Sequence, residues 1–302
     1  MKKSERILGA LFGVAVGDAL GAPLEFMTEQ EIEEQHGYVH DMIGGGWLDV
    51  KPGEVTDDTQ MTIAVAEGII DNPRSPVESV GARFIEWAKS KPKDIGATCF
   101  KSIARASDNF TVNKPNKHKW REASFSVMKS LNGRSAGNGS LMRTIYPALY
   151  YSRMERAADV ATDISEMTHA DGEVSVVVRD YVRMTFDAVN GAQPEKILWG
   201  DRVAQYAFPS VLSPTGYVMD SFLTAVSCLR AAQKEAPERN KFYYAVSKAV
   251  NCGGDADTIG AITGGLAGAM WGYGNIPTKW LRALDSDIHH SLIVLAAEAY
   301  RA

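Results

Sequence analysis

The 302-residue sequence is poor in the features that define several protein classes. Its only cysteines are Cys99, Cys228 and Cys252, and none forms a CxxC pair. Such a sparse, odd set is typical of a reducing compartment, with buried free thiols, rather than of a disulfide framework. Positive charge is also scarce: the net charge is −5 and nothing resembles a basic stripe. This balance argues against a nucleic-acid partner.

Long hydrophobic runs are missing as well. Apart from the N-terminus, no segment approaches the about 18 uninterrupted apolar residues that suggest a membrane span. The run Ile7–Phe12 follows two lysines and superficially resembles a signal peptide, but it is short, lacks a clear cleavage site and is bracketed by Glu5, Arg6 and Asp18. We therefore expect no membrane partner and a cytoplasmic location.

Strand-like alternation is scarce, and helical periodicity dominates. No composition shift, linker or internal repeat divides the chain, so we predict an all-α fold in which residues 1–302 form a single compact helical domain. The predicted helices are Ser4–Leu20, Asp58–Ile70, Pro76–Ser90, Ser152–Met167, Gly172–Val189, Asp220–Ala232, Lys241–Val250, Asp257–Gly272 and His289–Tyr300. The polar segment Asn109–Trp120 is predicted to be an exposed loop.

Two of these helices carry glycine at every fourth position. Each glycine costs a helix about 0.5–1 kcal/mol relative to alanine, so four per helix require compensation. A spacing of four places them near one face, where a neighbouring backbone can approach closely. We expect both helices to lie deep in the core, packed against each other, with the acidic residues at their ends converging. The glycines are Gly9, Gly13, Gly17, Gly21, Gly260, Gly264, Gly268 and Gly272.

The most informative features are two acid-rich tetrads, Thr56–Thr59 (TDDT) and Asp255–Thr258 (DADT), each at the start of a predicted helix. Paired carboxylates beside hydroxyl groups are ligands that hard divalent cations such as Mg²⁺ or Mn²⁺ prefer. Two such clusters could hold a pair of ions about 4 Å apart, as in two-metal hydrolytic sites. The alternative is helix capping, which explains one acid per helix start more easily than two.

Five stretches occur together and in a characteristic order, and with them the chain resembles the ADP-ribosylglycohydrolase family from about Arg6 to Trp271. The TDDT and GGDADTIG motifs are specific, whereas the glycine loop alone is weak. The five stretches are Gly13–Phe26, Gly53–Met61, Gly137–Arg143, Thr168–His169 and Gly253–Gly260.

This resemblance implies an all-α fold with two Mg²⁺ or Mn²⁺ ions in a cleft. It assigns the metal ligands to the residues that the oxygen-ligand argument selects. Glu25 matches a family glutamate near the metals that ligates them or positions water; the alternative is an ordinary exposed glutamate. The implied metal ligands are Thr56, Asp57, Asp58, Asp255, Asp257 and Thr258.

The glycine loop is implied to hold the diphosphate of ADP-ribose, through Gly137, Asn138, Gly139 and Ser140. Its glycines let backbone N–H groups approach an anion, and the serine adds a hydroxyl donor. Taken alone, the same letters are typical of a turn. Arg143 either pairs with phosphate or braces the loop.

Three further residues are implied to bind substrate. His169 would line the ribose or phosphate pocket, although a lone histidine is usually a capping or solvated residue. Tyr217 would pack near adenosine, with core packing as the alternative. Asp94 matches an aspartate of members that act on arginine-linked ADP-ribose, where a carboxylate can pair with a guanidinium; the alternative is a helix N-cap.

The sequence thus predicts a metal-dependent hydrolase that cleaves the glycosidic bond between ADP-ribose and an acceptor, most simply protein arginine. Glu25, Asp57 and Asp257 are the candidate general bases. The substrate would be an ADP-ribosylated protein or a small molecule. Alternatives are a serine-linked or small-molecule-linked ADP-ribose substrate, phosphoester or diphosphate chemistry at the same metals, or a catalytically silent ADP-ribose-binding relative.

Overall fold

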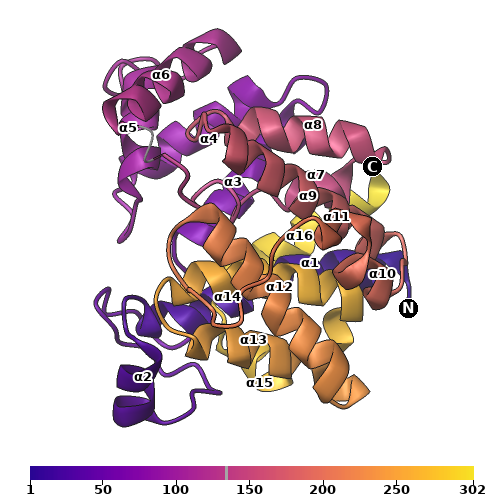
Figure 1. Ribbon diagram of the computed structural model, residues 1–302. Coiled ribbons are helices and arrows are strands. Elements are labelled where there is room, and N and C mark those ends of the chain that lie inside the picture. The colour runs from indigo at the N-terminus through magenta and orange to yellow at the C-terminus, as the bar shows by residue number, and fades with distance from the viewer. Residues whose placement is uncertain (133–134) are drawn as a thin grey trace.

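The computed structural model describes residues 1–132 and 135–302, and its regular elements are helices (Figure 1). In the described residues, strand-like pairing is limited to isolated bridges. The predicted all-α fold is confirmed. The elements are α1 (Lys3–Gly21), η1 (Ala22–Leu24), α2 (Glu29–His36), α3 (Asp57–Asp71), α4 (Val77–Lys89), α5 (Ala97–Ala106), α6 (Lys117–Ser130), α7 (Tyr146–Tyr150), α8 (Met154–Ser165), α9 (Gly172–Val189), α10 (Pro194–Trp199), α11 (Asp201–Ala204), α12 (Val218–Glu235), η2 (Glu238–Asn240), α13 (Lys241–Asn251), α14 (Ala256–Trp271), η3 (Tyr273–Asn275), α15 (Thr278–Ala283) and α16 (Ser286–Arg301).

The glycine-spaced helices α1 and α14 pack against each other, as predicted, and form the centre of the fold. Gly13 lies against Gly264 and Gly17 lies against Gly260. A Cβ atom added to either α1 glycine would overlap the carbonyl oxygen of its partner. Because there is no side chain between them, the two backbones touch, and the dispersion contacts along this seam offset the helix cost of the glycines.

The direction of this seam decides where the acids lie. Gly9 meets Gly268 while Gly21 meets Ala256, so the two helices are antiparallel. The C-terminal end of α1 is therefore beside the N-terminal end of α14. As a consequence, the segment that carries Glu25 and the loop that carries Asp255 are neighbours in space.

α1 also explains the apolar N-terminus. By length and composition alone, Lys3–Leu24 could cross a membrane, with a mean hydropathy of 1.7 over its most apolar window. In the folded chain, 94% of that window is buried inside the protein. Here the apolar composition is that of a core helix, packed on α14 and α16.

The nine predicted helices all form, with ends shifted by at most a few residues. The prediction missed the shorter or more polar helices, including α2, α5 and α6. The predicted loop Asn109–Trp120 was wrong at its end, because α6 begins at Lys117 and the side chain of Trp120 is fully buried. The buried face of α6 is formed by Trp120, Ala123, Ser124 and Val127. Only Trp120 is large, so the apolar stripe is weak in an otherwise polar helix.

Candidate active site

The segment after α1, the loop before α14 and the start of α3 meet at one end of the central helix pair. Phe26 N–H donates to the carbonyl of Gly254 at 2.7 Å, and Gly254 N–H donates back to Met27 at 2.7 Å. This short backbone pairing ties the segment after α1 to the loop before α14. It brings Glu25 to Asp255 and Asp257, and one carboxylate oxygen from each lies within 4.8 Å of the others.

Asp18 joins the start of α3 to this group. Its carboxylate is fully buried and accepts hydrogen bonds from the backbone N–H and the hydroxyl of both Thr56 and Thr59. Burial raises the pKa of Asp18 to about 6, although these hydrogen bonds oppose the rise. Asp18 therefore fixes the position of the tetrad Thr56–Thr59 through these hydrogen bonds. The sequence motifs do not indicate this supporting role.

The tetrads do not act as helix caps through their side chains, so the capping alternative was wrong. Thr56 and Asp255 occupy the N-cap positions of α3 and α14, yet neither side chain makes a capping hydrogen bond. Instead, Thr258 Oγ1 donates to Asp58 Oδ2 at 3.4 Å, which links the two tetrads. Asp58 Oδ1 is buried without a hydrogen-bond partner in residues 1–132 and 135–302. A buried, unpartnered carboxylate oxygen is costly, and it is the atom that a cation would satisfy.

The electrostatics point the same way. Burial, followed by repulsion from the neighbouring acids, raises the pKa values of Asp57, Asp58 and Asp257 well above their ordinary range. Burial likewise raises the pKa of Glu25 to about 8. Within the described part of the chain, no lysine or arginine forms an ion pair with these four carboxylates. The cluster therefore has a strong deficit of positive charge.

The cleft above the carboxylates has a volume of about 260 Å³. One wall carries Asp94, which is partly buried. Burial raises the pKa of Asp94. The N-cap of α5 is Gly96, so the helix-cap alternative for Asp94 was wrong. The other lining residues are Glu25, Phe26, Asp57, Gly96, Ala97, Thr98, Cys99, Gly137, Asn138, Gly139, Met142, His169, Asp255, Asp257 and Thr258.

The glycine loop forms the facing wall. Gly137, Asn138 and Gly139 line the cleft, and Asn138 Nδ2 donates to Asp255 Oδ2 at 2.7 Å and to Ser221 Oγ at 2.8 Å. The loop thus also orients an acid of the cluster. Ser140 is fully buried, and its hydroxyl accepts a hydrogen bond from Ser165 at 2.8 Å, on the side of α8.

Arg143 braces this loop from inside the protein. Its fully buried guanidinium donates to the carbonyl of Gly139, to Thr168 Oγ1 at 2.7 Å and to Cys99 Sγ at 3.4 Å. It also lies over the ring of Phe84, 4.7 Å from its centroid. Of the two roles left open for Arg143, the contacts support bracing.

His169 and Tyr217 occupy different environments. His169 is buried at the cleft wall, with Nδ1 2.7 Å from Thr168 Oγ1, and burial together with Arg143 lowers its pKa to about 3. The imidazole is therefore neutral near pH 7. Tyr217 is 40% exposed and its hydroxyl donates to Glu173 at 2.7 Å, so the core-packing alternative was wrong. Its backbone pairs with Gly137, which places it at the edge of the glycine loop.

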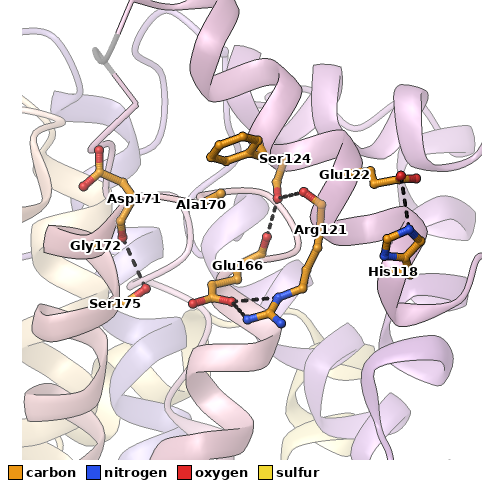
Figure 2. A pocket seen from close by; sticks show the side chains of 10 residues that line it. His118, Arg121, Glu122, Ser124, Glu166, Ala170, Asp171, Gly172 and Ser175 are labelled. Carbon is orange, nitrogen blue, oxygen red and sulfur yellow. Dashed lines mark hydrogen bonds and ion pairs between the residues drawn. The ribbon is translucent and has the colours of Figure 1, made fainter.

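A second hollow lies between α6 and the turn that leads from α8 into α9, with a volume of about 510 Å³ (Figure 2). We call it the α6–α9 groove. Most of its charged side chains bond to one another, whereas Asp171 accepts hydrogen bonds from the hydroxyl of Ser135 and from the backbone N–H of Glu173. Arg121 donates to Glu166 at 2.8 Å and His118 lies 3.1 Å from Glu122. No sequence motif maps to this groove.

With the geometry established, comparison with known proteins identifies the class. The family model for ADP-ribosylglycohydrolase matches residues 1–302, and the chain belongs to this family. The resemblance noted in the motifs is thereby confirmed.

Individual relatives agree. The ADP-ribosyl-[dinitrogen reductase] glycohydrolase of Rhodospirillum rubrum is 31% identical over 95% of this chain and 93% of its own length. The ADP-ribosylarginine hydrolase Tri1 of Serratia proteamaculans (strain 568) is 28% identical over 93% of this chain and 75% of its own length. A solved structure described as an ADP-ribosylglycohydrolase-related protein complex is 28% identical, covers 99% of this chain and 98% of its own, and superposes with a TM-score of 0.79.

Proposed function

We propose that the protein is a metal-dependent hydrolase that removes mono-ADP-ribose from arginine side chains of proteins. The observation that carries the proposal is a cluster of buried carboxylates with a deficit of positive charge, facing a glycine loop, in a chain of the ADP-ribosylglycohydrolase family. The names of two relatives, which act on ADP-ribosylated dinitrogen reductase and on ADP-ribosylarginine, support the substrate class.

The residues present fit two Mg²⁺ or Mn²⁺ ions. All six donors supply oxygen, which these hard cations prefer, and the unpartnered Asp58 Oδ1 is available for coordination. When bound, such ions orient the ribose hydroxyls, lower the pKa of a water molecule and favour the ionised form of nearby carboxylates. The ligands we propose are Thr56, Asp57, Asp58, Asp255, Asp257 and Thr258.

Among the candidate bases Glu25, Asp57 and Asp257, we favour Glu25. Trp47 Nε1 donates to Glu25 Oε2 at 2.6 Å, which fixes the carboxylate and leaves Oε1 to accept a proton from the attacking water. Glu25 also lines the cleft beside the acids that would hold the metals. As the bond to the anomeric carbon breaks, positive charge develops on the sugar, and neighbouring carboxylates stabilise it.

The chain's other residues would bind the substrate around that centre. The backbone of Gly137–Gly139 would hold the diphosphate, with the neutral His169 supplying a ring nitrogen beside it. Tyr217 would contact the adenosine at the loop's edge, and Asp94 would pair with the guanidinium leaving group. The hydroxyl of Ser140 is bonded to Ser165, so we expect its contribution to come from the loop backbone.

The test is the release of free ADP-ribose from an arginine-ADP-ribosylated peptide and a serine-ADP-ribosylated peptide, each with Mg²⁺, Mn²⁺ or EDTA. The proposal predicts metal-dependent release from the arginine peptide. Release only from the serine peptide would overturn the linkage. No release from either, with ADP-ribose still bound in calorimetry, would favour a silent binding relative, and AMP among the products would indicate diphosphate chemistry. The single-domain organisation and the cytoplasmic location stay predictions.

A further inference from the structure

Two aromatic side chains are exposed at the mouth of the acidic cleft. Phe26, which lines the cleft, is 67% exposed, and Trp47 is 52% exposed. Their ring centroids are 5.4 Å apart with an interplanar angle of 41°, so the rings contact each other. Such exposed aromatic area is unfavourable in water and, beside a site, indicates a binding surface.

The backbone holds both rings at this place. Phe26 has φ = 66°, a left-handed conformation that is uncommon for a bulky residue, and its N–H is bonded to the carbonyl of Gly254 at 2.7 Å. Trp47 sits in a tight loop that Gly45 and Val50 close with hydrogen bonds of 2.7 and 3.0 Å. The indole N–H reaches Glu25. Local strain kept in place by surrounding bonds is a common property of functional sites.

A carboxylate completes the mouth of the cleft. Asp94 lines the same cleft as Phe26. The neighbouring Lys93 donates to the carbonyl of Asp49 at 3.1 Å and forms an ion pair with Glu54 at 2.8 Å, so the segment of Asp94 is tied to the loop of Trp47. Aromatic rings beside a carboxylate match a guanidinium group, which stacks on rings and pairs with carboxylates through its planar N–H donors.

We propose that Phe26 and Trp47, together with Asp94, form the acceptor subsite and recognise the guanidinium of an ADP-ribosylated arginine. This inference rests on the proposed function and assigns specificity to two residues outside the metal and diphosphate motifs. A serine acceptor has no cation and no planar donor for this surface. The rings therefore discriminate between leaving groups, while the ADP-ribose half of the substrate is held elsewhere in the cleft.

The experiment compares steady-state kinetics on an arginine-ADP-ribosylated peptide with calorimetric binding of free ADP-ribose. Phe26→Leu should raise KM about fivefold, the size of a partly exposed cation–π contact, with little change in ADP-ribose affinity. Trp47→Phe and Trp47→Leu both lose the N–H bond to Glu25, so both should lower kcat. Only Trp47→Leu loses the ring, and only it should also raise KM.

The control is Phe125→Leu, which removes an aromatic ring of similar exposure, 47%, in the α6–α9 groove. It should leave both constants unchanged. Unaltered ADP-ribose affinity shows that each variant is folded. If the wild-type protein releases ADP-ribose from arginine but Phe26→Leu and Trp47→Leu keep its KM, the acceptor subsite is overturned and the proposed function stands. If the wild-type protein releases none, the proposed function fails and the subsite fails with it.

Discussion

The acidic cleft and the α6–α9 groove lie close together, since the turn after α8 contributes His169 to the cleft and Ala170–Gly172 to the groove. The groove is the larger, at about 510 Å³ against about 260 Å³. In the groove, Arg121 forms an ion pair with Glu166, and Glu122 is exposed to solvent. Asp171 accepts hydrogen bonds from Ser135 and from the backbone N–H of Glu173. In the cleft, the buried carboxylates of Glu25 and its neighbours have no partner of opposite sign among the described residues.

The difference shows that volume is a poor guide to function here and that charge compensation is a good one. A folded chain tolerates an exposed ion pair such as Arg121–Glu166 at almost no cost or gain. Burying several carboxylates together is strongly unfavourable unless a cation enters or protons bind. The cleft is therefore the region whose stability and activity should depend on metal ions and pH, and the groove is its internal control.

The largest expected effect comes from removing one cleft carboxylate. Asp57→Asn keeps the size of the side chain but removes a proposed metal ligand, and hydrolysis should fall more than about 100-fold, because loss of residues that merely support ligands already costs 10–100-fold. The matched change in the groove, Glu166→Gln, should keep activity within about twofold. Peptide release assays on both variants measure the difference. Equal activities would contradict the assignment of the site.

A second effect should come from the seam that positions the cleft. Gly17→Ala places a Cβ atom against the carbonyl of Gly260, and the overlap should destabilise the protein by about 1–3 kcal/mol and displace Glu25 from Asp255. Gly172→Ala, at the groove, meets no atom within 4 Å and should change stability far less. Urea denaturation gives both values. A Gly17→Ala protein as stable as wild type would show that the close contact of α1 and α14 is not required.

A third effect concerns pH in the absence of metal. The folded pKa of Glu25, about 8, lies above its ordinary value of 4.5, so the folded state binds the proton more tightly than the unfolded state. The stability that protonated Glu25 contributes to the folded state is therefore fully present below pH 4.5 and is lost as the pH rises toward 8. In EDTA, Glu25→Gln should therefore gain stability relative to wild type over this range. A difference that shrinks as the pH rises would contradict the argument.

The smallest effect should follow from breaking the groove's ion pair. Arg121 is 60% exposed and its interaction with Glu166 is solvated, so Arg121→Ala should change the free energy of unfolding by about 0–1 kcal/mol. Metal-dependent hydrolysis should stay at the wild-type level. Thermal unfolding and the peptide assay check both points. A large loss of activity would show that the groove takes part in catalysis.

The sequence predicted the long helices and the central seam because their signals are local. Glycine at every fourth position on two helices admits few structures other than close backbone packing, and α1 and α14 form that packing. It also predicted that the acids after α1 and before α14 converge, since antiparallel packing brings those ends together. The shorter or more polar helices were not predicted, because a contact such as that of Trp120 with the core depends on the whole fold.

The roles of several site residues were not readable from the sequence for the same reason. Arg143 braces the loop rather than facing the cleft, and Asp18 supports the first tetrad, because burial and long-range hydrogen bonds decide both. Trp47 lies outside the five motif stretches, and Phe26 ends one of them with no chemical role of its own. Only their placement around Glu25 draws attention to them. Which metal ion binds and which acceptor linkage is cleaved depend also on ions and substrates outside the chain, so the sequence does not decide them.

The most direct test of the central claim is the number of Mn²⁺ ions bound per chain, measured by equilibrium dialysis on metal-stripped protein. We predict two ions for the wild-type protein and for Glu166→Gln, and fewer than two for Asp57→Asn. Equal binding by all three proteins, or no Mn²⁺ bound by the wild-type protein, would contradict the view that the uncompensated carboxylates of the cleft form a dinuclear metal centre.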